Sequence, residues 1–205
     1  MMAIDIDRVA FLHHAAMGES LWAKLGVSFL RTLYQGLINS DRFLGFVYME
    51  DGEVKGFIAG SMDADRMMSE VFSVSWLPLG LAALPGLRRP SVLLRLLETA
   101  RYFDKSTPGA SIPAESLFCS FTPELRGKRI SGHINKVLFD ELLARGLEQV
   151  KVTTEVSNAG ANRQLQSWGF VERGRFRFYG KDMITYVLDL VASERVSPTS
   201  RHPAV

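Results

Sequence analysis

Apolar residues recur at helical spacing in the N-terminal part of the chain. The pattern covers residues 8–17 and 27–38, and a segment containing glycine and serine separates the two stretches. Apolar positions three and four residues apart are typical of amphipathic helices. We therefore predict two helices joined by a turn. Residues 1–7 leave room only for a very short first strand.

Two runs of β-forming residues follow, at positions 43–50 and 53–62, and they flank the dipeptide Asp51-Gly52. Asp-Gly between such runs favours a tight hairpin, because both central residues of its turn have positive φ. The pattern therefore predicts an antiparallel hairpin.

Residues 64–112 have a different character. Their apolar segments, 71–84 and 92–103, are punctuated by prolines at positions 78, 85, 90 and 108. Prolines end helices and do not support strands. We therefore predict a helical insertion over residues 64–112, with prolines ending its helices.

The longest apolar run lies within this insertion, at residues 76–87. It is shorter than the ~20 residues that a membrane-spanning helix needs. Arg88 and Arg89 follow it directly, a pattern that leaves open a contact between residues 76–89 and a membrane surface.

The pattern after the insertion alternates between strand and helix. A strand at 115–121 precedes a helix that starts at Ile130 and ends at Arg145-Gly146, and a strand follows at 150–156. A strand, a helix and a strand with short connections form a βαβ unit, whose right-handed crossover makes the strands parallel.

The C-terminal part predicts a short helix at 158–168 and an antiparallel pair of strands, 170–178 and 183–190. Residues 193–205 are polar and contain proline, so we expect a flexible tail. The predicted fold class is α+β, a single domain over residues 1–192 with a mixed, mostly antiparallel twisted sheet, a central βαβ unit and a helical insertion.

Composition excludes several classes of protein. Of the 205 residues, 47% are hydrophobic and 22% charged, which is the balance of a chain that folds around a core. The 24 basic and 22 acidic residues leave a charge of only +2, so we expect no nucleic-acid partner. The single cysteine, Cys119, excludes an internal disulfide. We see no secretory signal at the N-terminus and expect a cytoplasmic protein.

No metal site is expected. His13 and His14 are adjacent on a predicted helix, so their side chains point ~100° apart, which is a poor geometry for one metal ion. Cys119 lies in an apolar strand without a partner cysteine nearby, as a buried structural thiol does.

The turn FTPELRGKRISG, at residues 121–132, places a glycine and three basic residues between a strand and a helix. Unpaired N–H groups at a helix N-terminus attract anions such as a pyrophosphate. A P-loop is excluded, because His133 and Ile134 stand where Lys and Ser/Thr are required. The absence of GxGxxG disfavours a dinucleotide fold.

The strings SFTPELRGKRISGHINKVLFDELLARG and SNAGANRQLQSWGF, with the order of elements, resemble the GNAT superfamily of acyl-CoA-dependent N-acyltransferases. That family carries R/Q-x-x-G-x-G/A after a Pro-containing turn, and an Asn-led helix ending in Gly-Phe. The resemblance covers residues 43–190 apart from the insertion. It implies an acetyl-CoA site formed by Cys119, Ser120, Phe121, Arg126, Gly127, Lys128, Arg129, Ile130, Ser131, Gly132, Asn158 and Asn162.

The chain departs from the family pattern at three positions. Arg129 stands where the family usually has its second glycine, and Ser131 where it has Gly or Ala. We expect both in the first helical turn with negative φ, so that they tighten or shift the pyrophosphate seat without destroying it. Leu165 replaces the tyrosine that serves many relatives as general acid, and Tyr179 is a candidate substitute.

The resemblance implies direct attack of an amine on the thioester of acetyl-CoA. A backbone N–H of residues 119–121 would polarise the carbonyl, and the pantetheine arm would lie between diverging strands at 115–121 and 150–156. The substrate ammonium must lose a proton. Glu155 is the first candidate base and Glu115 the second, and the alternative for each is a solvated carboxylate at a strand end.

The sequence therefore predicts an N-acetyltransferase that acts on a primary amine of a small molecule, with an amino sugar as a candidate acceptor. A protein or peptide amine is the alternative acceptor. Leu165 keeps a second reading open, a non-catalytic acyl-CoA-binding module. The apolar insertion is interpreted as a lid or homodimer surface, or as a patch that meets lipid.

Overall fold

The computed structural model describes residues 1–18, 20–88, 92, 109, 111–125, 127–178 and 180–197. Its helices are η1 (Ala3–Asp5), α1 (Ile6–Ala16), α2 (Leu21–Leu25), α3 (Val27–Ile38), α4 (Ala64–Val74), α5 (Trp76–Leu87), η2 (Pro123–Leu125), α7 (Ile130–Ala144) and α8 (Ala159–Ser167). Its strands are β1 (Phe43–Glu50), β2 (Glu53–Ser61), β3 (Glu115–Phe121), β4 (Gln149–Glu155), β5 (Val171–Phe178) and β6 (Lys181–Asp189).

The strands form one six-stranded sheet in the order β1-β2-β3-β4-β6-β5. Every neighbouring pair is antiparallel except β3 and β4, which are parallel. The predicted mixed, mostly antiparallel sheet with a central βαβ unit is therefore confirmed. The hairpin prediction is confirmed as well, because Asp51 and Gly52 both have positive φ, 54° and 75°.

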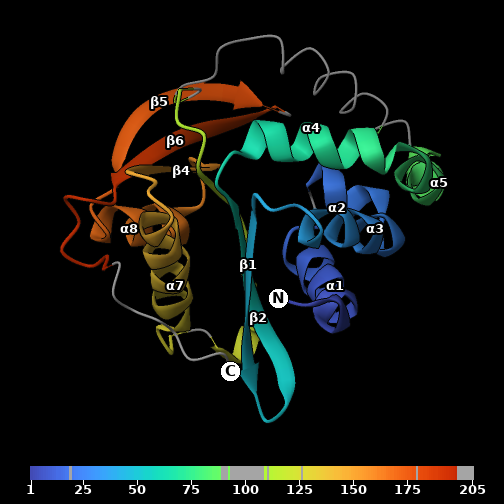
Figure 1. The fold of residues 1–205 in the computed structure, drawn as a ribbon, viewed down its shortest axis with the longest axis horizontal. Coiled ribbons are helices and arrows are strands. Elements are labelled where there is room, and N and C mark those ends of the chain that lie inside the picture. The colour runs from blue at the N-terminus through green and yellow to red at the C-terminus, as the bar shows by residue number, and fades with distance from the viewer. Residues whose placement is uncertain are drawn as a thin grey trace.

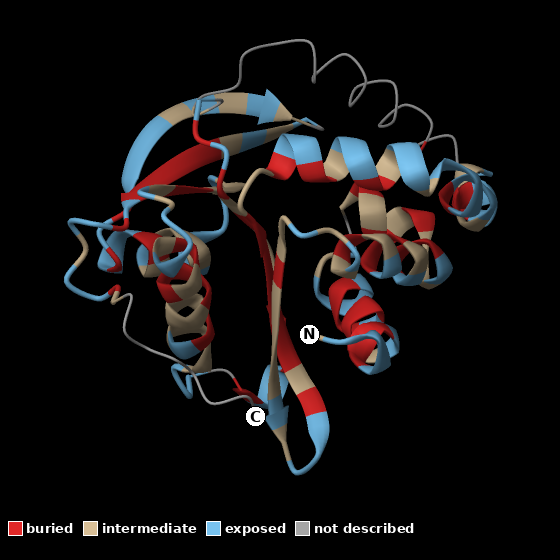
Figure 2. Cartoon of the chain, viewed as in Figure 1, coloured by how far each residue is buried: buried red, intermediate tan, exposed pale blue. Residues whose placement is uncertain are grey.

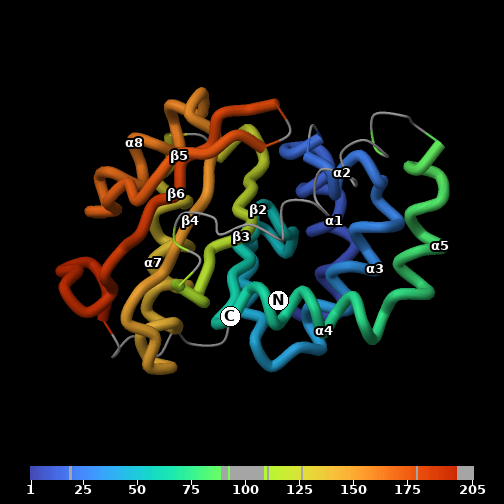
Figure 3. The backbone as a smooth tube through the Cα atoms, turned by 90° about the horizontal axis from the view of Figure 1, so that it is seen from above, coloured from blue at the N-terminus to red at the C-terminus, as the bar shows by residue number. Residues whose placement is uncertain are grey.

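Helices cover both faces of the sheet (Figure 1). Helices α7 and α8 lie on one face, and α1, α2 and α3 with α4 and α5 lie on the other, as the view from above also shows (Figure 3). Each helix turns its buried side toward the sheet or a neighbouring helix (Figure 2). Two hydrophobic clusters result, one around Leu30, Leu33 and Phe57, the other around Leu138, Phe139 and Leu188.

The N-terminal segment differs from the prediction. Residues 3–5 form a 3-10 helix and no strand, because the Met2 amide donates to the Asp5 carboxylate at 2.7 Å and starts the helical path. The predicted turn between the first two long helices contains the short helix α2, capped by the Ser20 hydroxyl. In both places a hydrogen bond between a side chain and a nearby backbone amide starts a short helix that the prediction did not contain.

The insertion is helical where it is described, as predicted. Helices α4 and α5 meet at 89°. Pro78 and Pro85 lie inside α5, so the expectation that these prolines end helices is wrong. Pro78 sits in the first turn, where a missing N–H costs no intrahelical bond. Most of residues 89–110, including Pro90 and Pro108, lie outside the described residues.

The start of the predicted tail is packed. Val196 is buried in the cluster around α7, and the Ser197 amide donates to the buried Asp140 carboxylate at 2.8 Å. Lys136 bridges Asp140 and the Arg195 carbonyl. Residues 193–197 are therefore packed, in contrast to the expected flexible tail. Burying the Asp140 carboxylate is costly without hydrogen-bond partners, and this segment supplies them. Residues 198–205 lie outside the described residues.

A buried polar pair joins α1 to α3. The His13 ring is fully buried, and its Nδ1 lies 2.9 Å from the Tyr34 hydroxyl. Its other ring nitrogen, Nε2, has no partner among the described residues. Burial lowers the pKa of His13 to about 4, with the charge of His14 adding to the effect. The ring is therefore neutral in the folded protein near neutral pH.

His13 makes stability depend on pH. Its folded pKa lies below the unfolded value of 6.5, so stability is fully present above pH 6.5 and falls as the pH drops toward 4. We expect a loss of about 3 kcal/mol in the free energy of unfolding over that range. His13→Gln should remove this loss, whereas His14→Gln at the exposed neighbour should keep most of it, because burial is the larger cause of the shift. Equal pH dependence of His13→Gln and wild type in denaturant titrations would contradict the prediction.

Candidate functional site

Strands β3 and β4 separate almost as soon as they meet. Their pairing comprises one residue pair, Glu115 with Lys151, supported by the bond from the Lys151 amide to the Ala114 carbonyl. From there the strands diverge toward their carboxyl ends. The facing backbone edges of β3 and β4 consequently have no ladder partners beyond this pair in the described chain. Such edges accept an extended ligand as they would accept another strand.

A β-bulge lies beside the point of divergence. Ser116 and Phe118 oppose neighbouring residues of β2, Gly60 and Ala59, so Leu117 is the extra residue of β3. Leu117 and Phe118 both pack toward the cluster that contains α1 and α3. A bulge redirects the backbone and releases groups from the ladder. The sequence predicted the strand but gave no signal for this bulge.

The turn after β3 lies at the open end of the divergence. Gly127 and Arg129 have positive φ, 79° and 58°, and helix α7 starts at Ile130. Among the described residues, none accepts a hydrogen bond from the amides of Ile130 and Ser131. Free amides at a helix N-terminus behind left-handed residues form a concavity that favours anions.

Arg129 departs from the conformation expected for it. It is the N-cap of α7 in the left-handed region and does not lie in the first helical turn with negative φ. Glycine is therefore favoured at this position for backbone conformation as well as for close approach. Ser131 is inside the first turn, as expected. The exposed Lys128 lies 3.9 Å from Glu50.

Helix α8 starts at the carboxyl end of β4, across the divergence from the turn. Asn158 caps it by accepting from the Ala161 amide at 3.2 Å. Asn162 donates through Nδ2 to the carbonyls of Glu155 and Val156, both at 3.1 Å. The buried Oδ1 of Asn162 has no partner in the described part of the chain. A buried acceptor without a partner is energetically costly.

Glu115 lies where β3 and β4 meet. Its carboxylate is 3.8 Å from Lys151 Nζ, and both side chains are largely buried, with 20% and 10% exposed. Burial raises the pKa of Glu115 to about 7, opposed by Lys151 and reinforced by Asp65 at the start of α4. A carboxyl group with such a pKa exchanges protons near neutral pH. Lys151 was not among the residues predicted for the site, although a lysine within an apolar strand was a signal for it.

Glu155 lies at the other end of β4. Its carboxylate pairs with Lys181 and accepts from the Ser157 hydroxyl. Four residues separate it from Lys151, or ~13 Å along a strand. Glu155 stays a prediction as the base, but Glu115 meets the requirements better, because it is more buried and lies at the meeting point of the strands.

The remaining predicted residues have different positions. The Cys119 side chain packs toward the α7 cluster, and burial raises its pKa to about 12, so the thiol stays protonated. The buried Ser120 hydroxyl donates to the Leu12 carbonyl at 3.3 Å. Leu165 is a core residue. Arg126 and Tyr179 lie outside the described residues.

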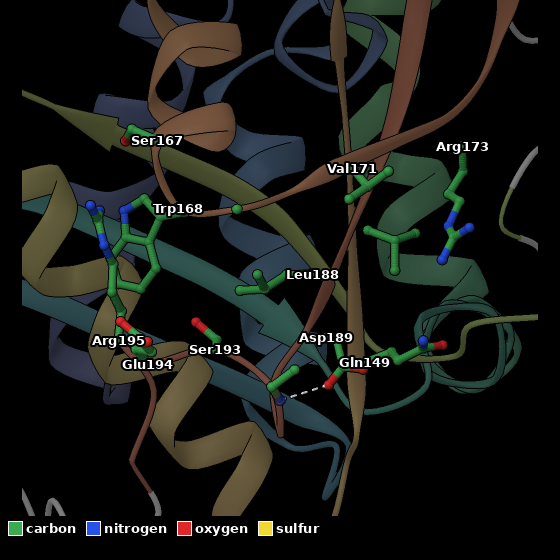
Figure 4. Close-up of a pocket in the computed structure, with 13 residues that line it drawn as sticks. Gln149, Ser167, Trp168, Val171, Arg173, Leu188, Asp189, Ser193, Glu194 and Arg195 are labelled. Carbon is green, nitrogen blue, oxygen red and sulfur yellow. Dashed lines mark hydrogen bonds between the residues drawn. The ribbon is translucent and has the colours of Figure 1, made fainter.

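The structure therefore brings most of the predicted cofactor residues to one place. The turn at 127–132 and the Asn-led helix flank the open end of the β3–β4 divergence, with the backbone of 119–121 between them. A separate hollow of about 400 Å³ lies beside Trp168 and Leu188 (Figure 4). Gln149, the first residue of β4, lines it, so it belongs to the opposite end of that strand.

Comparison with known proteins identifies relatives by sequence and by structure. No family model matches the chain. A mycothiol acetyltransferase of Brachybacterium faecium is 31% identical over 75 residues. The match covers 36% of this chain and 23% of that protein, so the chain spans less than a quarter of this relative's length.

Solved structures match over most of the chain. SsHAT is 16% identical with a TM-score of 0.69, and the match covers 93% of this chain and 96% of SsHAT. A ribosomal-protein-alanine N-acetyltransferase from Brucella melitensis is 16% identical with a TM-score of 0.60, over 92% and 96% of the two chains. At these identities the structures establish the fold, and it is the fold that the sequence resemblance predicted.

The left-handed conformation of Arg129 generates a test. Arg129→Gly should raise the free energy of unfolding by about 1 kcal/mol relative to Arg129→Ala, because only glycine adopts positive φ without steric cost. Both variants lose the guanidinium equally, so the comparison isolates the backbone. Denaturant titrations measure the difference, and equal stabilities would show that Arg129 is not strained.

Proposed function

Because this chain has the fold of the GNAT acetyltransferases, we propose that it is an acetyl-CoA-dependent N-acetyltransferase. The observation that carries the proposal is the divergence of β3 and β4, with a turn of two positive-φ residues before the N-terminus of α7 at its open end. The proposed acceptor is a primary amine of a small molecule, with an amino sugar among the candidates.

The charges and free amides at the divergence support coenzyme A as the proposed cosubstrate. The amides of Ile130 and Ser131 would receive the pyrophosphate, and Lys128 and Arg129 add positive charge beside it. The unpaired edges of β3 and β4 would hold the pantetheine arm. Acetyl-CoA supplies an acetyl thioester, which is activated toward an amine.

Glu115 is proposed to accept the proton of the attacking amine. The carboxyl group lies at the narrow end of the divergence, on the face that also carries α4. Lys151 beside it keeps part of the carboxyl population ionised despite burial. Leu165 is buried in the core, so this chain supplies no proton at the position where many relatives carry tyrosine.

The alternative acceptor is a peptide N-terminal amine. The similar structure from Brucella melitensis is a ribosomal-protein-alanine N-acetyltransferase, and this similarity supports a peptide amine as the alternative acceptor. An assay for release of free CoA distinguishes the two acceptor classes. It would test a panel of amino sugars, other small amines and peptides that begin with alanine. If acetyl-CoA binds but no amine releases CoA, the chain is an acyl-CoA-binding module.

Ser131→Glu tests the anion-binding turn. A carboxylate in the first turn of α7 should stabilise the helix slightly, by about 0.3–1 kcal/mol, yet repel the pyrophosphate. We therefore expect acetyl-CoA binding to weaken by about tenfold or more while the melting temperature holds or rises. Ser131→Gln is the matched uncharged control and should bind nearly as wild type does. Unchanged affinity of Ser131→Glu in calorimetry would contradict the proposed seat.

Glu115→Gln tests the proposed base. The activity of the wild type should rise with pH through about 7, as the Glu115 carboxyl group loses its proton. The variant should lose about 100-fold or more in kcat and lose this inflection, with little change in the affinity for acetyl-CoA. Glu172→Gln, on the exposed strand β5, is the matched control. A wild-type pH profile in Glu115→Gln would return Glu155 to first place.

A further inference from the structure

Helix α5 is apolar on every side. Its twelve residues, WLPLGLAALPGL, include no charged and no polar side chain. The inner side is fixed to the protein through Leu79, Ala83 and Gly86, all buried. A Cβ added at Gly86 would lie 2.7 Å from the Leu25 Cα atom, so α5 rests directly on the end of α2. The helix therefore cannot rotate to bury its other side.

The outer side of α5 forms an exposed apolar ridge. Leu77, Leu81 and Leu84 recur at helical spacing and have 53%, 60% and 55% of their surface exposed. Trp76 and Val74 extend the ridge at its start, with 68% and 83% exposed. We call these five residues the α5 ridge. Single exposed apolar residues are common, but a contiguous ridge marks an interaction surface.

The α5 ridge has basic charge at one end and no acidic charge within it. Over residues 71–88 the charged residue is Arg88, exposed at the end of α5, and the sequence continues with Arg89. The nearest preceding acidic residue, Glu70, is paired with Arg42 at 2.9 Å. The surface is thus apolar with a basic end, which suits an apolar partner whose boundary is negatively charged.

The position of the ridge favours a planar, deformable partner. Helix α5 lies at the end of the molecule farthest from β5 and β6 in both views (Figures 1 and 3). A twelve-residue helix is about 18 Å long, so the α5 ridge is a narrow apolar strip along one side of α5. A second copy would also bring its own basic end without acidic residues in the ridge to meet it.

We propose that the α5 ridge docks on an anionic lipid bilayer, with its leucines and Trp76 at the boundary between headgroups and acyl chains and Arg88 at the headgroups. No single described helix is long and apolar enough to cross a bilayer, and α4 and α5 qualify by length and composition only as a bent pair. In this proposal α5 lies along the bilayer surface, because its inner side is packed against α2. This surface is independent of the proposed acetyl transfer.

Flotation of the full chain with vesicles tests the proposal. Vesicles of phosphatidylcholine mixed with phosphatidylglycerol should carry the protein, and pure phosphatidylcholine should carry less. Leu81→Glu should weaken binding by about tenfold or more, because it removes a leucine that the bilayer would bury and adds a charge that anionic lipid repels. Ile4→Glu, at a position 84% exposed on η1, is the matched control and should bind as wild type does.

Arg88→Gln tests the electrostatic contribution to vesicle binding. It should weaken binding to the anionic vesicles by about fivefold and leave binding to pure phosphatidylcholine unchanged. Unchanged melting temperatures and acetyl-CoA affinity would show that both variants fold. The proposal is overturned if the wild type does not float or if Leu81→Glu floats equally well. It is also overturned if light scattering finds a dimer that Leu81→Glu dissociates, because the α5 ridge would then be a protein interface.

Discussion

The divergence of β3 and β4 is the constraint on which the rest of the site depends. Each paired backbone group stabilises a sheet. In the centre of this sheet, however, β3 and β4 stop pairing after one residue pair. The helices α7 and α8 start at the two separated strand ends, so their free amides and capping residues face a common opening. Closing the strands would bury the opening and remove the site.

The two faces of the sheet carry different parts of the proposed site. On one face α7 and α8 pack around Leu138, Phe139 and Trp168, and this core fixes the helix starts that bound the opening. Glu115 and Lys151 are largely buried where the strands meet. The proposed pyrophosphate seat and the proposed base are thereby separated along the length of the strands. The ridge of α5 lies farther out and contributes to neither.

Local strain and unsatisfied groups concentrate at this opening. Arg129 holds a left-handed conformation that glycine would adopt at lower cost, and Asn162 keeps a buried oxygen without a partner. His13 carries a further unpartnered atom, but it lies within the core between α1 and α3.

The sequence by itself determined the order of elements, the Asp51-Gly52 hairpin, the βαβ unit and the candidate anion-binding turn, because periodicity and turn chemistry are local properties. It could not determine the bulge at Leu117, the left-handed Arg129 or the packed residues 193–197. Nor could it rank Glu115 above Glu155, since the pKa of a carboxyl group depends on burial and neighbours distant in sequence. Those features follow from which strands pair and where they separate, and only tertiary packing decides that.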